Sequence, residues 1–243
     1  MKYLKLAFSF LTIFPMRLDE SIEIKDLNRS AGWFPFIGFF IGGFVVLMKW
    51  GASFLFSPLV SSVLALAIWV ALSGGLHLDG LADCFDGMCA SATPERRLEI
   101  MKDPRLGTFG GVGLVLTLVL KIALLAALPA AIMPLAILSA TTLGRWMVLF
   151  GARLKQARPT GLGTAFSTGL KWRSYILAGL LPIVMSVSAG VQGLAALAAV
   201  HVTGFLVLRS AKRRLGGMTG DVFGLLIELS EVVVLAVFAI QPS

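Results

Sequence analysis

The feature that most constrains this chain is a series of long apolar stretches separated by short polar or basic connections. These stretches fall at residues 32–48, 59–76, 109–128, 132–150, 175–190, 192–208 and 222–240. A helix rises about 1.5 Å per residue, so about 20 apolar residues cross a hydrocarbon core of about 30 Å. Backbone polar groups in lipid need internal hydrogen bonds, which favours helices over lone strands. The pattern predicts an all-α, polytopic integral membrane bundle with about seven transmembrane helices.

The composition excludes an ordinary soluble globule. Hydrophobic residues make up 57% of the chain and charged residues only 14%, whereas soluble domains average about 25% charged residues. The apolar stretches leave little of the 243 residues for a soluble part, so we expect one membrane-embedded catalytic domain over residues 1–243. The two cysteines, Cys84 and Cys89, form no CxxC motif, which indicates free thiols.

The basic residues predict an orientation. The chain has 21 Lys and Arg residues and a net charge of +8. If the N-terminus is cytoplasmic, all of them except Lys49, Lys121 and Arg145 fall on the cytoplasmic connections, as the positive-inside rule requires. This predicts an N-in, C-out topology with the lipid bilayer as a partner, and an amphipathic interfacial helix over residues 2–14. No basic helix or tail with interleaved aromatic residues is present, so nucleic acid is not an expected partner.

An acidic motif, LSGGLHLDGLADCFDG at residues 72–87, follows the second apolar stretch. Asp79, Asp83 and Asp86 are spaced i, i+4, i+7, which places three carboxylates on one face of a helix. Carboxylates near a membrane cost about 2.5–3.5 kcal/mol each on insertion scales, and oxygen ligands suit a hard ion such as Mg²⁺. We therefore predict a catalytic, metal-binding face. The alternative is a solvated charged face of a connecting helix.

A second acidic set opens the last apolar stretch, in GGMTGDVFGLLIELSE at residues 216–231. Asp221, Glu228 and Glu231 again lie on one helical face. Acidic groups inside a membrane span are functional by default. We predict that Asp221 joins the catalytic, metal-binding set and that Glu228 and Glu231 contact substrate. The alternative is a packing role in which Arg145 or Lys121 neutralises the two glutamates.

Several further polar residues are candidates for binding an anionic substrate. Basic side chains in ERRLEIMKDPRLGTFGG, residues 95–111, and a Gly-rich loop at 151–166 provide cations and close backbone approach. Setting the membrane topology is the competing explanation for these basic residues. The predicted substrate-binding residues beside the two glutamates are His77, Arg96, Lys102, Asp103, Arg105, Arg153 and Thr219.

At these motifs the chain resembles the cobalamin synthase family, the adenosylcobinamide-GDP ribazoletransferases. The matching stretches, in family order, are LTIFP (11–15), GWFPFIGFFIGG (32–43), HLDGLADCFDG (77–87), RRLEIMKDPRLGTFG (96–110), GRWMVLFGARLKQARPTGLG (144–163) and GGMTGDVFGLLIELSE (216–231). The resemblance implies an enzyme that joins adenosylcobinamide-GDP to α-ribazole or its 5′-phosphate and releases GMP. It also implies Mg²⁺ dependence and a place in a prokaryotic inner membrane, with the active site facing the cytoplasm.

This activity fits the residues, since the site must neutralise a diphosphate and orient or deprotonate an alcohol. We expect Asp79, Asp83 and Asp86 to hold Mg²⁺ on the diphosphate, with Asp221 as a further ligand or as the base. The basic residues of 95–111 would neutralise the phosphate and the leaving GMP. Whether the protein forms a homo-oligomer or associates with other cobalamin-assembly enzymes stays open.

Two other readings remain open at the level of the sequence. The acidic face is similar to that of the CDP-alcohol phosphotransferases, which act on lipids, but that family has an Ala-Arg pair after the first Asp-Gly. Here Leu81-Ala82-Asp83 stands in that place. A cation- or proton-coupled transporter could use Asp221, Glu228 and Glu231 as coupling residues, although the chain shows no clear internal repeat.

Overall fold

A computed structural model describes residues 1–18, 26–167 and 169–240 of the chain. Every regular element in these ranges is a helix, and an isolated bridge pairs Gln156 with Met218. The elements are α1 (Lys2–Leu11), α2 (Leu27–Ser30), η2 (Ala31–Trp33), α3 (Phe34–Ser53), α4 (Pro58–Ser73), α5 (Leu76–Cys89), α6 (Pro94–Ile100), α7 (Thr108–Ala127), α8 (Met133–Gly151), α9 (Leu162–Ser167), α10 (Trp172–Ser188), α11 (Gly190–Leu215) and α12 (Gly220–Ala239).

The apolar stretches form the long helices of a polytopic membrane bundle, as predicted. Five helical segments are long and apolar enough to cross a membrane: Leu27–Ser53, Thr108–Ala127, Met133–Gly151, Gly190–Leu215 and Gly220–Ala239. The bent pair α4 and α5 adds a sixth if it forms one span, and the apolar helix α10 is shorter. The all-α membrane fold is therefore confirmed, while the count of seven spans and the N-in orientation stay predictions.

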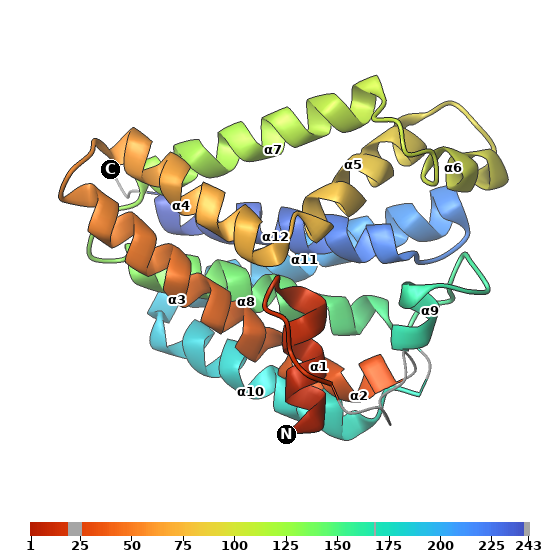
Figure 1. Cartoon of the computed structure of the whole chain (residues 1–243), viewed down its shortest axis with the longest axis horizontal. Coiled ribbons are helices and arrows are strands. Elements are labelled where there is room, and N and C mark those ends of the chain that lie inside the picture. The colour runs from red at the N-terminus through yellow and green to blue at the C-terminus, as the bar shows by residue number, and fades with distance from the viewer. Residues whose placement is uncertain (19–25, 168, 241–243) are drawn as a thin grey trace.

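Two helices form the centre of the bundle. Most of α8 and α12 is buried, whereas α7 and α11 expose most of their apolar side chains. The central α12 packs against α5, α7, α8 and α11, and α8 also packs against α3. Most of the long helices run roughly along the longest axis of the molecule, while α1 runs across it (Figure 1). The exposed faces of α7 and α11 fit a lipid surround, because lipid solvates apolar side chains that water would not.

A sharp bend separates α4 from α5. The two helices meet at 90°, and Gly74 and Gly75 between them have φ values of 62° and 70°. Glycine adopts this left-handed conformation without the steric penalty of a Cβ atom. The predicted second span, 59–76, therefore ends as a helix at Ser73, and the acidic motif occupies a separate helix that turns back toward α12.

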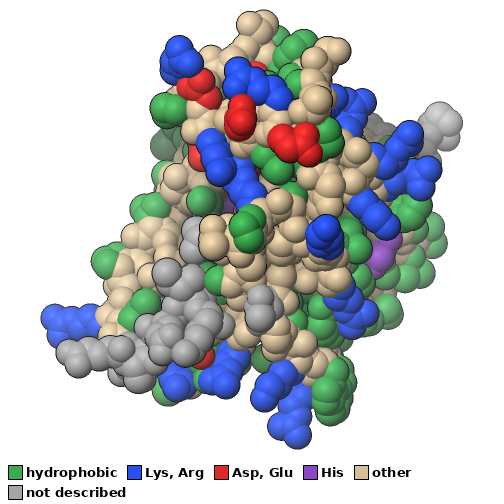
Figure 2. Space-filling view, turned by 90° about the vertical axis from the view of Figure 1, so that its right-hand side faces the viewer, with side chains coloured by type: hydrophobic (Ala, Val, Ile, Leu, Met, Phe, Trp, Pro, Cys, Tyr) green, Lys and Arg blue, Asp and Glu red, His purple; other side chains and the backbone are tan. Residues whose placement is uncertain are grey.

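The basic side chains gather at one end of the bundle. Figure 2 views the molecule from the right-hand side of Figure 1 and shows Lys and Arg side chains across this end. The predicted exceptions, Lys49, Lys121 and Arg145, are all buried. Lys49 donates to Ser61 Oγ and Ser62 Oγ of α4 at 3.3 and 3.0 Å. Lys25, one of the residues assigned to the cytoplasmic side, lies outside the described residues.

Candidate functional site at the junction of α5 and α12

The structure brings the two predicted acidic sets together where α5 crosses the beginning of α12. A Cβ atom on Gly80 would lie 2.8 Å from the backbone oxygen of Asp221, a distance that side-chain carbons do not tolerate. Glycine at this position therefore permits the close approach of the two helices. As a result Asp79 and Asp83 on α5 lie beside Asp221 in the first turn of α12, although about 140 residues separate them in sequence.

Asp79 and Asp83 are the carboxylates at this junction that the protein leaves unneutralised. Neither accepts a hydrogen bond nor forms an ion pair within the described parts of the chain. Asp79 is exposed and Asp83 is partly buried. Asp83 is close enough to Asp221 and Asp79 to be repelled by both, and Arg158 offsets part of that repulsion. Such an arrangement favours binding of a cation or of a cationic ligand group.

Asp221 differs because protein groups hold it in place. Arg158 Nη1 lies 3.2 Å from Asp221 Oδ2, and the Thr219 hydroxyl donates to the same oxygen at 3.2 Å. Thr219 also accepts a hydrogen bond from the Val222 amide at 3.3 Å, which caps the first turn of α12. Arg158 belongs to the loop 151–166, which the sequence indicated as a source of cations and close backbone approach, but it was not among the predicted site residues. Only the fold shows that its guanidinium reaches Asp221.

Asp86 differs from Asp79 and Asp83 because it binds the beginning of α7. Its two carboxylate oxygens accept hydrogen bonds from the amides of Gly107 and Gly110, each at 2.8 Å. The first amides of a helix have no partners within the helix, so a carboxylate stabilises them and the positive end of the helix dipole. The structure thus gives Asp86 a capping role that the sequence did not predict. Its catalytic and metal-binding roles stay predictions.

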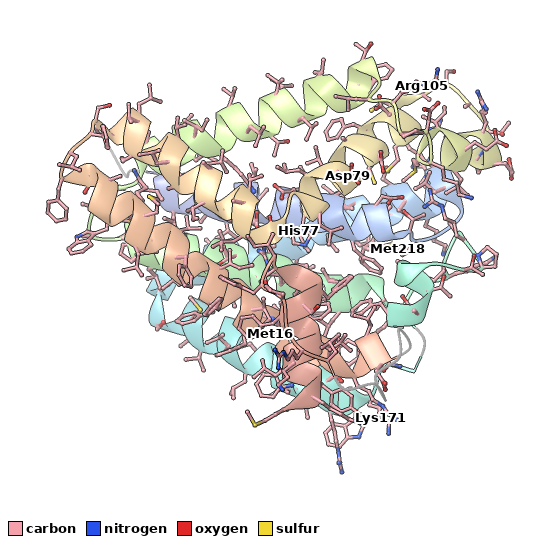
Figure 3. The ribbon with its side chains drawn as sticks, viewed as in Figure 1. Met16, His77, Asp79, Arg105, Lys171 and Met218 are labelled. Carbon is pink, nitrogen blue, oxygen red and sulfur yellow. The ribbon has the colours of Figure 1, made fainter. Side chains whose placement is uncertain are left out.

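An aromatic cavity opens beside the acidic junction. Its walls include Phe34, Phe166 and Phe223, and polar groups of His77, Asp79 and Asp221 also line it. The ring of Phe166 stacks on Phe34 at 5.3 Å between centroids and meets Phe223 edge-on at 5.4 Å. Figure 3 shows His77 and Asp79 at the beginning of α5, where it passes α12. This cavity offers planar apolar surface next to carboxylates, a combination suited to a heteroaromatic ligand with charged substituents.

His77 is a polar group in this cavity without a partner. Only 4% of its surface is exposed, and neither ring nitrogen makes a hydrogen bond with the protein. A buried polar group without a partner costs free energy. His77 lines the cavity and its ring nitrogens have no protein partner, and its contact with substrate stays a prediction.

A second, polar cavity adjoins the first at Asp221. It is lined by side chains and glycines from the loop after α8 and from the start of α12: Gln156, Arg158, Thr160, Gly161, Gly163, Thr164, Met218, Thr219, Gly220 and Asp221. Asp221 lines both cavities. The loop after α8 and the connection from α11 to α12 are held together by two backbone hydrogen bonds: the Met218 amide donates to Lys155 O at 2.9 Å, and the Ala157 amide donates to Met218 O at 2.8 Å. The two cavities therefore adjoin at Asp221, and together they form the candidate site.

Glu228 and Glu231 lie deeper along α12 and are fully paired. The Lys121 ammonium contacts Glu228 and Glu231, each at 2.5 Å, and Arg145 binds the other oxygen of Glu231. All four side chains are buried. This is the neutralised arrangement that the sequence analysis kept as the alternative. Neither glutamate lines the two cavities, and substrate binding by them stays a prediction.

The remaining predicted substrate contacts lie outside the two cavities. Arg96 pairs with Glu99, and Arg105 binds Asp103 through two contacts of 2.9 and 2.7 Å. That guanidinium holds the pKa of Asp103 at about 2, well below its ordinary value. Arg153 stacks over the Tyr175 ring at 4.1 Å, and Lys102 is exposed. In Figure 3 Arg105 lies near the start of α7, away from His77 and Asp79.

The donor chemistry of the junction fits a hard cation in one particular way. Across the described residues no group of three or more His, Cys, Asp or Glu side chains is placed to hold a metal ion. Mg²⁺, however, is commonly bound by one or two carboxylates together with phosphate oxygens of a substrate and water. Asp79 and Asp83 have no competing protein partners and meet that requirement, whereas Asp86 and Asp221 are engaged by amides and by Arg158.

The fold and this site define a multi-pass helical membrane protein with an acidic site at one end of its bundle. A family model described as cobalamin-5-phosphate synthase matches residues 3–239, and the chain belongs to that family. No solved structure matches the chain.

Relatives with established names extend along nearly the whole chain. An adenosylcobinamide-GDP ribazoletransferase of Stutzerimonas stutzeri is 40% identical over 98% of this chain and 98% of its own length. Enzymes of the same name from a Roseiflexus species and from Desulfitobacterium hafniense are 38% and 35% identical, each over 97% of this chain and over 88% and 95% of their own lengths. The resemblance noted from the motifs is therefore confirmed.

Proposed function

We propose that this protein transfers the adenosylcobinamide-phosphate group of adenosylcobinamide-GDP to α-ribazole or its 5′-phosphate and releases GMP. The product is the completed adenosylcobalamin or its 5′-phosphate. The family membership and the names of the relatives support this substrate pair. A prokaryotic inner membrane with the site facing the cytoplasm accords with the basic side chains at the end of the bundle where the site opens (Figure 2).

The observation that carries the proposal is the meeting of Asp79 and Asp83 with Asp221 and Arg158 beside an aromatic cavity. Transfer of a phosphoryl group from a diphosphate to an alcohol, with GMP as the leaving group, needs charge neutralisation and an oriented hydroxyl more than covalent help from the protein. Arg158 would bind phosphate oxygens through its guanidinium. Asp221 lies where the two cavities meet, so it is placed to orient the attacking hydroxyl and accept its proton.

Asp79 and Asp83 would hold Mg²⁺ together with the diphosphate of the substrate. The ion, when bound, supplies positive charge that polarises the phosphoryl oxygens and stabilises the leaving phosphate. The two carboxylates favour a cation beside them, because positive charge relieves their mutual repulsion. Binding of the ion by two carboxylates together with substrate phosphate also accords with the described residues, which contain no group of three or more protein ligands for a metal.

The aromatic cavity would receive a flat ring, either the base of α-ribazole or the guanine of the nucleotide. Phe34, Phe166 and Phe223 present ring faces and edges at stacking distance from one another, and offset or edge-on contacts between rings contribute about 0.5–1.5 kcal/mol beyond burial. His77 would then hydrogen-bond to a polar atom of the bound ring and lose its unpartnered state.

The test is a reconstitution with defined substrates. Detergent-purified protein is incubated with adenosylcobinamide-GDP, α-ribazole and Mg²⁺, and nucleotide and corrinoid products are separated by chromatography. We expect equal amounts of GMP and completed corrinoid, and no product when EDTA replaces Mg²⁺. Release of CMP from a CDP-alcohol, with none of GMP, would contradict the proposal and favour the lipid phosphotransferase. Solute flux in vesicles without any nucleotide would instead favour the transporter.

A further inference from the structure

A groove on the side of the bundle lies apart from the candidate site. Two adjoining hollows share Leu206, Ser210 and Arg214, and together we name them the lateral groove. None of its lining residues lines the aromatic or the polar cavity. The lining residues are Cys84, Phe85, Met88, Cys89, Leu206, Val207, Arg209, Ser210, Arg213, Arg214, Leu225 and Leu229.

The two ends of the lateral groove differ in chemistry. The end between α5, α11 and α12 is walled by apolar side chains such as Phe85, Leu225 and Leu229. At the other end, which lies along the last turns of α11, Arg209, Arg213 and Arg214 gather around Ser210. A ligand that fills the whole groove must therefore carry a negative group at one end and an apolar chain at the other.

The basic end carries positive charge that no acidic side chain among the described residues neutralises. Arg214 donates to the backbone oxygen of Met88 at 2.5 Å, which ties α11 to the end of α5. Arg209 and Arg213 are exposed and form no ion pair or hydrogen bond through their side chains within the described parts of the chain. Two unneutralised guanidinium groups beside a third favour a phosphate, which they can bind through paired N–H donors.

The length of α11 places these arginines at the membrane surface. Its segment from residue 190 to residue 208 contains no Asp, Glu, Lys or Arg, and at about 1.5 Å per residue it spans about 28 Å, close to the hydrocarbon thickness. The first arginine then lies at the level of lipid phosphates. Val202, Phe205 and Leu206 are more than half exposed on the preceding turns, so lipid contacts this helix directly.

We propose that the lateral groove binds an anionic phospholipid, with its phosphate on Arg209 and Arg213 and one acyl chain along Phe85, Leu225 and Leu229. Charge complementarity selects the lipid, because a zwitterionic headgroup would bring its own cation against three arginines. One wall of the groove is formed by Cys84, Phe85, Met88 and Cys89 of α5, the helix that also carries Asp79 and Asp83. The bound lipid therefore supports the outer face of the helix whose inner face forms the candidate site.

An exposed cysteine in the groove allows the proposal to be tested by fluorescence. Cys89 is exposed and lines the lateral groove, while Cys84 is buried. Labelling of the purified full-length protein with a thiol-reactive bimane thus places a fluorophore at the groove. The protein is reconstituted in phosphatidylcholine nanodiscs. Increasing fractions of a lipid with brominated acyl chains are then added, either brominated phosphatidylglycerol or brominated phosphatidylcholine. We expect brominated phosphatidylglycerol to quench at a several-fold lower mole fraction than brominated phosphatidylcholine.

Two matched pairs of variants locate the effect. Arg213→Gln should raise the mole fraction for half-quenching by roughly fivefold, whereas Lys212→Gln, which removes an equal charge from the neighbouring position outside the groove, should leave it near the wild-type value. Leu229→Trp should fill the apolar end and weaken quenching by both lipids. Phe205→Trp, on an exposed face outside the groove, should not.

Three results would overturn the proposal. Equal quenching by the two lipids would remove the selectivity for anionic lipid, and equal shifts in the Arg213 and Lys212 variants would show a diffuse surface field. Relief of quenching by inorganic phosphate or by saturating adenosylcobinamide-GDP would assign the groove to a soluble phosphate or to the substrate. None of these measurements depends on turnover, so a failed reconstitution of activity and a failed lipid site are distinguishable.

Discussion

Two pairs of acidic residues in this bundle differ in whether basic residues of the protein neutralise them. Glu228 and Glu231 are buried and matched by Lys121 and Arg145, so the four charges sum to zero. Asp79 and Asp83 lie at the end of the bundle beside two cavities and have no matching cation within the described residues, apart from the more distant attraction of Arg158. The contrast shows that depth in the bundle and neutralisation by the protein are separate properties of an acidic residue. We expect the acids without a protein cation to serve the reaction and the neutralised acids to serve packing.

The largest effect should come from breaking the paired set. Glu231→Gln leaves Lys121 and Arg145 with one glutamate between them, and breaking a buried ion pair costs about 3–5 kcal/mol. We expect that loss in the free energy of unfolding, measured by denaturant titration in mixed micelles. The charge-balanced double variant Lys121→Met/Glu231→Gln should regain part of it. A single variant as stable as the wild type would show that the network does not stabilise the bundle.

A smaller loss in the free energy of unfolding should follow from Asp86→Ala. This variant tests whether Asp86, unlike Asp79 and Asp83 on the same helix, stabilises the fold. The variant leaves the amides of Gly107 and Gly110 without their acceptor, and loss of such a cap costs about 1–2 kcal/mol. The same unfolding titration measures it, with the exposed Glu95→Ala as a control. Abolished turnover at unchanged stability would contradict a purely structural role and support the predicted catalytic role of Asp86.

The smallest effect should come from the exposed pair of Asp103 and Arg105. The pKa of Asp103 is lowered to about 2, so any stabilisation by this pair is present above the unfolded pKa of about 4 and disappears only as the pH falls through about 2. We expect Asp103→Asn to melt at the wild-type temperature across neutral pH, because exposed pairs contribute little. A lower melting temperature that follows pH near neutrality would contradict this.

Much of the fold could be predicted from residue patterns. Apolar length predicted the long helices, and the spacing of Asp79 and Asp83 predicted a shared helical face. The three basic residues that broke the charge pattern, Lys49, Lys121 and Arg145, are buried and partnered. In this chain, a basic residue that departs from the positive-inside pattern marks an internal polar contact.

The rest required contacts between distant segments. Asp86 continues the i, i+4, i+7 spacing of Asp79 and Asp83 on α5, yet it caps α7, because the fold brings Gly107 within its reach. Arg158 carried no spacing signal and reaches Asp221 from a loop. The aromatic cavity collects Phe34, Phe166 and Phe223 from three separate helices, and no local pattern predicts such an assembly.

The most direct test of the account compares two amide substitutions side by side, with release of GMP from adenosylcobinamide-GDP measured alongside the melting temperature. Asp83→Asn should lower GMP release by about 10²–10³-fold, the usual cost of a lost electrostatic group at a reaction centre, while its melting temperature stays at the wild-type value. Glu228→Gln should show the reverse pattern, a lower melting temperature with turnover retained in the folded fraction. Near-normal release of GMP by Asp83→Asn would contradict the account.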